Sequence, residues 1–67
     1  MKAFFTTDRD GAVHVRARME GADAIGDFHR VLRAGQEFYG LSQEMLQDRG
    51  AGVIEVDGQG NVRLADP

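Results

Sequence analysis

Residues 51–65 read AGVIEVDGQGNVRLA, two short apolar runs on either side of a glycine-rich turn. This pattern indicates a β-hairpin whose register depends on the length of its loop. A three-residue loop at 58–60 pairs apolar with apolar and acid with base, as Val56–Val62, Ile54–Leu64 and Glu55–Arg63. A two-residue loop would instead place Ile54 opposite Arg63. We therefore predict strands over 51–56 and 61–65 in the first of these registers.

A second hairpin is predicted at the N-terminus. Lys2–Thr7 contains two aromatic residues and two threonines, which favour a strand. Residues 8–11 (DRDG) form a turn sequence in which Gly11 suits a positive φ. The segment Ala12–Met19 then alternates apolar and polar residues, as expected of a half-buried strand.

The stretch between the hairpins predicts two helices. The first runs from Asp23, a favourable N-cap, to Ala34, and its apolar face consists of Ile25, Phe28 and Leu32. The second runs from Ser42, also an N-cap, to Arg49. Residues 36–41 either extend the first helix or form an irregular connection.

These elements follow one another in the order β-β-α-α-β-β. An antiparallel sheet with both helices on one face would bury the apolar side of every element. We therefore expect an α+β fold in which residues 1–67 form a single small domain.

Length, charge and cysteine content exclude several classes of protein. The chain has 67 residues, no cysteine and a net charge of −3, which leaves no room for a large enzyme fold, a disulfide framework or a thiolate metal site. The acidic balance argues against general affinity for nucleic acid. The apolar stretch at the N-terminus ends at Thr6, too soon for a signal peptide, and no window is apolar enough to span a membrane. We expect a cytoplasmic monomer or homodimer.

Catalytic and metal-binding signals are weak. The two histidines, His14 and His29, fall on different predicted elements and do not form a spaced ligand pair. The turns at 8–11 and 57–61 resemble calcium loops only faintly, because neither supplies six oxygen ligands. We predict no catalytic residue, no metal and no cofactor, and hence no enzyme.

Acidic residues suggest one binding surface. The predicted helices carry Asp23 and Asp27 on one outer face and Glu44 and Asp48 on another. Spaced carboxylates can imitate the phosphates of a duplex and occupy a basic channel on a partner. The plain alternative is that these residues are the solvated sides of amphipathic helices.

The strand over 12–19 suggests a competing surface. His14, Arg16 and Arg18 share one face, and either Phe4 or Phe5 must share it with them, because adjacent residues of a strand point to opposite sides. An aromatic ring beside cations can stack bases and hold phosphates, or serve as an anchor for a protein partner. The plain alternative is a solvated sheet face.

In size, charge and composition the whole chain resembles the small phage-encoded inhibitors, including anti-CRISPR proteins that block a Cascade-type surveillance complex. The resemblance implies stoichiometric inhibition without a cofactor, by masking a nucleic-acid-binding surface of a CRISPR effector. A protein or ribonucleoprotein partner is then expected rather than free nucleic acid or a membrane. Two alternatives stay open: a nucleic-acid-binding module that uses His14, Arg16 and Arg18, and a structural or adaptor subunit of a phage particle or toxin–antitoxin pair.

Overall fold

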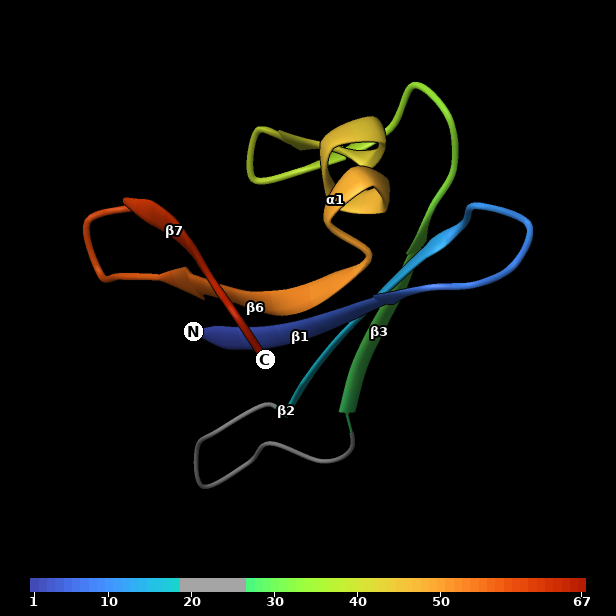
Figure 1. Ribbon diagram of the computed structural model, residues 1–67. Helices are drawn as coiled ribbons and strands as arrows, with labels where there is room; N and C mark the ends of the chain where they lie inside the picture. Colours follow the sequence, from blue (N-terminus) through green and yellow to red (C-terminus); the bar gives the residue numbers. More distant parts are fainter. Residues whose placement is uncertain (19–26) are drawn as a thin grey trace.

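The structure, a computed structural model, describes residues 1–18 and 27–67 (Figure 1). Five strands form one antiparallel sheet in the order β3-β2-β1-β6-β7, and β4 and β5 form a separate two-stranded hairpin. The elements are β1 (Lys2–Thr7), β2 (Val13–Arg18), β3 (Asp27–Leu32), β4 (Glu37–Phe38), β5 (Leu41–Ser42), α1 (Gln43–Arg49), β6 (Ala51–Val56) and β7 (Val62–Ala65). Figure 1 shows α1 and the β4–β5 hairpin on one side of a twisted sheet. No described helix is long and apolar enough to cross a membrane.

Both predicted hairpins are confirmed. β6 and β7 pair Val56 with Val62 and Ile54 with Leu64, which is the register of the three-residue loop. Within that loop the Gly60 amide donates to the Asp57 carbonyl at 3.1 Å. At the other hairpin Phe5 faces Val15. Gly11 in its turn has the expected positive φ of 89°.

The predicted helix over 23–34 is wrong where the structure describes it, and with it the two-helix α+β class. Residues 27–32 form β3, which pairs along its length with β2. Phe28 and Leu32 are four residues apart, a spacing that places two side chains on one face of a helix and equally on one face of a strand. Leu32 is buried and Phe28 packs against the core. The strand is favoured because pairing with β2 satisfies backbone groups that β2 would otherwise leave at an open edge.

Residues 36–41 adopt neither of the two expected forms. They lie in the β4–β5 hairpin, where Phe38 pairs with Leu41. Both residues between them have positive φ, 50° at Tyr39 and 80° at Gly40, as a tight hairpin turn of the primed type requires. The hairpin buries Phe38 against Phe28, with 5.9 Å between the ring centroids.

The predicted helix over 42–49 is confirmed as α1. The Ser42 hydroxyl accepts the Met45 amide at 3.1 Å, which makes Ser42 the N-cap. Gly50 ends the helix with a φ of 84°, and its amide donates to the Leu46 carbonyl at 3.0 Å. The side-chain amide of the buried Gln43 donates to the Gly11 carbonyl at 2.6 Å and so attaches α1 to the β1–β2 turn.

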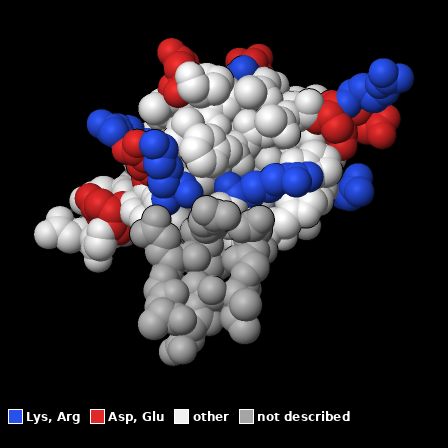
Figure 2. Space-filling view, turned by 90° about the horizontal axis from the view of Figure 1, so that it is seen from below, with Lys and Arg blue, Asp and Glu red and all other residues white. Residues whose placement is uncertain are grey.

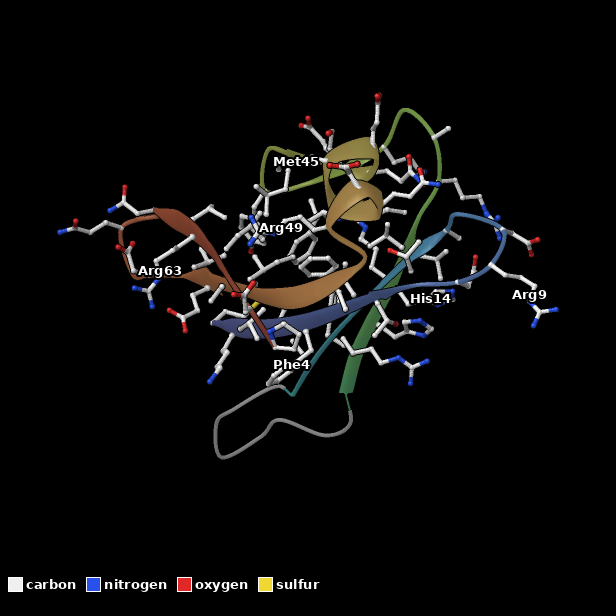
Figure 3. All side chains as sticks on the ribbon, in the orientation of Figure 1. Phe4, Arg9, His14, Met45, Arg49 and Arg63 are labelled. Atoms are coloured by element: carbon white, nitrogen blue, oxygen red, sulfur yellow. The ribbon has the colours of Figure 1, made fainter. Side chains whose placement is uncertain are left out.

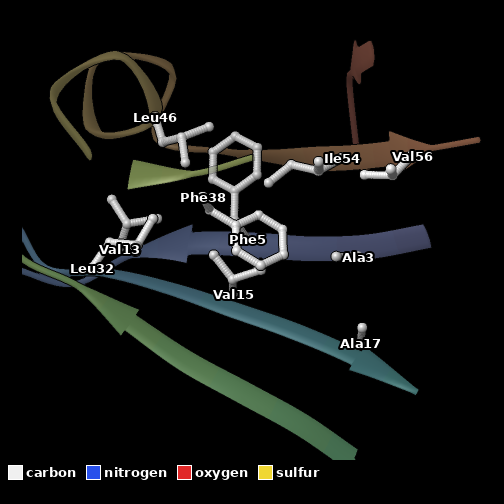
Figure 4. Close-up of a cluster of buried hydrophobic side chains, with 10 residues drawn as sticks. All are labelled: Ala3, Phe5, Val13, Val15, Ala17, Leu32, Phe38, Leu46, Ile54 and Val56. Atoms are coloured by element: carbon white, nitrogen blue, oxygen red, sulfur yellow. The ribbon is translucent and has the colours of Figure 1, made fainter. Parts of the chain in front are cut away.

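The core lies between the sheet and the layer formed by α1 and the β4–β5 hairpin (Figure 4). Alternate residues of the central strands point into it, and Leu46 of α1 and Phe38 of β4 cover them. Its largest fully buried side chains are Phe5, Leu32, Leu46, Ile54, Val13 and Val15. No described element covers the opposite side of the sheet.

Candidate binding face

The structure decides which phenylalanine is exposed. Phe5 is buried in the core with 1% of its surface accessible, whereas Phe4 is 53% exposed on the opposite side of the sheet. Figure 3 shows Phe4 and His14 both projecting from the side of the sheet that faces away from α1. We call this side the open face and define it by Lys2, Phe4, Thr6, His14, Arg16 and His29.

The centre of the open face consists of one aromatic ring and two cations. Phe4 on β1 lies directly across from Arg16 on β2, and both are exposed. Lys2, two residues before Phe4 on the same strand, places its Nζ 5.8 Å from the ring centroid. This is within the range of a cation–π contact. In Figure 2 Lys and Arg side chains cross the middle of this face, whereas Asp and Glu side chains lie toward its rim.

A chain of polar side chains lies beside this centre. Asp8 Oδ2 is 2.9 Å from His14 Nε2, and His14 Nδ1 is 3.2 Å from His29 Nε2. The two imidazole rings stack with their centroids 5.5 Å apart. The hydrogen bond with His14, followed by those from the amides of Ala12 and Asp10, holds the pKa of the Asp8 carboxyl below its ordinary value. Asp8 therefore stays ionised beside His14 in neutral solution.

Arg18 is the remaining member of the predicted cationic row. Its backbone lies in β2 opposite Asp27 of β3, and the side chains of both residues lie outside the described part of the structure. The row is thus brought together at His14 and Arg16, with Phe4 as the aromatic neighbour.

The predicted acidic surface does not form on two helices. Asp23 lies outside the described residues, and Asp27 belongs to β3 rather than to a helix. Glu44 and Asp48 are exposed on α1 as expected. This helix lies on the side of the sheet away from the open face (Figure 1). Glu44 and Asp48 border a surface depression that Ser42, Met45 and Gln47 also line.

Sequence reasoning missed two residues of the open face. Lys2 was hidden by its place at the chain start, and its contact with Phe4 follows from ordinary strand periodicity. His29 was assigned to a helix, although the run DFHRVL also has a period-two pattern that would place it on a strand face with Asp27 and Val31. That second pattern is the signal that could have revealed it.

The turns that faintly resemble calcium loops are hairpin turns. Asp57 accepts the Gln59 amide at 2.8 Å, the Asn61 amide at 2.9 Å and the Asn61 side-chain amide at 3.0 Å. These bonds, chiefly that from the Asn61 side chain, lower the pKa of Asp57. Within residues 1–18 and 27–67, no group of three or more His, Asp or Glu side chains is arranged to hold a metal ion.

Comparison with models of known protein families, with curated proteins and with solved structures finds no match.

Proposed function

We propose that the protein is a small, non-enzymatic, cytoplasmic binding protein that holds single-stranded nucleic acid on the open face. The observation that carries the proposal is the half-exposed Phe4 ring flanked by Lys2 and Arg16, on a side of the sheet that no described element covers. A base can stack on an exposed aromatic ring whatever its sequence, while neighbouring cations contact the phosphates on either side.

The charge distribution supports this proposal despite the net charge of −3. The exposed carboxylates of Glu44 and Asp48 lie on α1, on the other side of the sheet. On the open face, Glu55 lies across from Lys2 and is paired with Arg63, and Asp8 is bound to His14. A single-stranded nucleic acid bound across Phe4 would therefore place its phosphates near Lys2 and Arg16. Direct contacts of this kind are shorter than the Debye length of about 8 Å, so physiological salt screens them only in part.

Single strands suit this face better than duplexes. Stacking on Phe4 requires an unpaired base, and in a duplex the bases are already stacked on each other. Reading a duplex in the major groove normally needs a protruding helix or ribbon with basic side chains. Within the described residues the helix is α1, whose exposed side carries Glu44 and Asp48.

Fluorescence anisotropy with a labelled oligothymidylate of roughly 12 nucleotides tests the proposal, since sites of this type span about 4–16 nucleotides. We expect Phe4→Ala to weaken binding about 5- to 150-fold, the equivalent of about 1–3 kcal/mol of lost stacking. If Lys2 and Arg16 each contact one phosphate, the logarithm of the affinity should fall with the logarithm of the salt concentration with a slope of about −1.4. Arg16→Ala removes one of these contacts and should make the slope shallower by about 0.7.

Tyr39→Asn is the matched control for this experiment. Tyr39 is as exposed as Phe4, at 56%, but it lies in the β4–β5 turn, and Asn tolerates its positive φ. Binding that is unaffected by Phe4→Ala, or lost equally in Tyr39→Asn, would contradict the proposal. The absence of salt-sensitive binding by the wild-type protein would contradict it as well.

A second candidate function rests on α1 and retains the predicted phage-encoded inhibitor of the anti-CRISPR type. Glu44 and Asp48 are four residues apart on the exposed side of this helix, and Met45 beside them is 39% exposed. Carboxylates around an apolar side chain suit contact with a basic protein surface that normally holds nucleic acid.

One pair of double variants separates the two functions. If the protein inhibits a Cascade-type complex through α1, Glu44→Lys with Asp48→Lys should restore target-DNA binding by that complex. Lys2→Ala with Phe4→Ala should then leave inhibition intact. If the open face is the functional surface, Lys2→Ala with Phe4→Ala should weaken nucleic-acid binding, and Glu44→Lys with Asp48→Lys should not. If both double variants still inhibit target-DNA binding, α1 is excluded as the inhibitory surface.

A further inference from the structure

Two imidazole groups that lie far apart in the sequence meet on the open face. His14 is on β2 and His29 is on β3, where the register pairs His29 with Arg16 and places His14 on the adjacent diagonal. His14 Nδ1 and His29 Nε2 are 3.2 Å apart. His29 is exposed and His14 is half-buried, so the pair can be reached from solvent.

This separation is the one that two nitrogen ligands of a single ion require. Zinc–imidazole bonds are about 2.0–2.1 Å long, so two ligands on one ion lie about 2.9–3.4 Å apart between the octahedral and tetrahedral angles. The nitrogens of the His pair fall within this range. The same two atoms are also within hydrogen-bond distance of each other, so that one donates and the other accepts.

Asp8 gives His14 the second contact that metal-binding histidines usually have. Its Oδ2 lies 2.9 Å from His14 Nε2, so an Nε2–H that donates to this oxygen leaves the lone pair of Nδ1 for a metal ion in place of the contact with His29. The carboxylate is itself oriented, because Oδ1 accepts the amides of Asp10 at 2.9 Å and Ala12 at 3.0 Å. The carboxylate of Asp8 and the imidazole that it orients are therefore already in place.

We propose that His14 and His29 form a binding site for one divalent transition-metal ion per chain, with Zn²⁺ as the expected ion and Asp8 as the residue that orients His14. Imidazole nitrogen favours Zn²⁺, Ni²⁺ and Cu²⁺ over Mg²⁺ and Ca²⁺, which prefer oxygen ligands. Because the described residues offer two protein ligands, water completes the coordination. The site therefore keeps positions that an external ligand can occupy.

Isothermal titration of the untagged protein with ZnCl₂, after dialysis against a chelator, tests this site without any nucleic acid. We expect saturable binding of one ion per chain, together with shifts of the His14 and His29 ring resonances in NMR spectra. His14→Asn and His29→Asn should each abolish saturable binding. Asp8→Asn should weaken it about tenfold or more, as loss of such a supporting carboxylate does at other sites.

Asp48→Asn is the control, because it removes an exposed carboxylate on the other side of the molecule and should leave Zn²⁺ affinity unchanged. Amide NMR spectra establish that each variant is folded, and the exposed position of His29 makes His29→Asn decisive if His14→Asn fails to fold. Equal Zn²⁺ affinity in wild type and His29→Asn would overturn the proposal. So would the absence of saturable heat with the wild-type protein.

Discussion

Gly52 lies directly across from Phe5 in the β1–β6 pair, and the ring of Phe5 occupies the space that a side chain at residue 52 would need. A Cβ added there would lie 2.8 Å from Phe5 Cε1 and 2.9 Å from the Ala65 carbonyl oxygen. The position of the Phe5 ring in the core therefore depends on a glycine of the neighbouring strand.

Gly52→Ala should destabilise the protein by about 1–3 kcal/mol, the usual cost of adding a methyl group to a filled core. The Ala65 carbonyl belongs to the backbone of β7 and can move only with that strand. The free energy of unfolding in urea measures the effect. Gly58→Ala is the matched control, since nothing lies within 4 Å of its added Cβ, and a change beyond about 0.5 kcal/mol is not expected there. Equal stability of the two variants would show that Phe5 is not confined as described.

Ser42→Ala should lower the free energy of unfolding by about 1 kcal/mol, because the Met45 amide loses the hydroxyl that caps α1. Ser42→Asp should retain most of the wild-type stability, since a carboxylate can accept the same amide. Thermal denaturation followed by circular dichroism compares the three proteins. If Asp destabilises as much as Ala, the capping role assigned to Ser42 is incorrect.

Thr7→Val should stabilise the protein by about 1 kcal/mol. The Thr7 hydroxyl is buried and finds no hydrogen-bond partner within the described part of the chain. Folding therefore removes this hydroxyl from water without replacing its hydrogen bonds, and a methyl group in its place avoids that cost. Thr6→Val, on the open face, is the comparison, because the Thr6 side chain is exposed and little change is expected. Chemical denaturation distinguishes the two, and a destabilised Thr7→Val would indicate that the hydroxyl is satisfied after all.

The Asp57 carboxylate should make the β6–β7 turn sensitive to acid. Its pKa is lower in the folded protein than in the unfolded chain, so its contribution is complete above the unfolded value of about 3.9 and is lost as the pH falls through the folded value. Asp57→Asn should therefore be less stable than wild type at neutral pH, with a difference that shrinks below about pH 4. Unfolding free energies of both proteins across this range provide the measurement. A difference that is independent of pH would mean that the charge of Asp57 does not stabilise the turn.

Local sequence rules predicted the elements whose partners are near in the chain. The register of β6 and β7 followed from matching Ile54 with Leu64 and Glu55 with Arg63, because only one loop length satisfies both pairs. The start of α1 followed from Ser42, whose hydroxyl bonds three residues ahead. In both cases the deciding interaction lies within a few residues and is visible in the sequence.

The error at residues 27–34 has a different origin. The spacing of Phe28 and Leu32 fits either period, and the choice between helix and strand depends on β2 having an unpaired edge. The same error hid the candidate metal site, because His29 reaches His14 only when both residues lie on adjacent strands. It also led to the prediction that Asp23 and Asp27 lie on the outer face of a helix, beside a second helix that carries Glu44 and Asp48.

The sequence by itself determined that the chain forms two hairpins and a capped helix, and that one phenylalanine of the pair at 4 and 5 must face away from the core. Only the tertiary structure decided that Phe4 is the exposed one, that Arg16 lies across from it, and that His14 meets His29. The reason is physical. Turn geometry, capping and alternation act over a few residues, whereas the side of the sheet that α1 covers and the partner of each edge strand depend on contacts between distant parts of the chain.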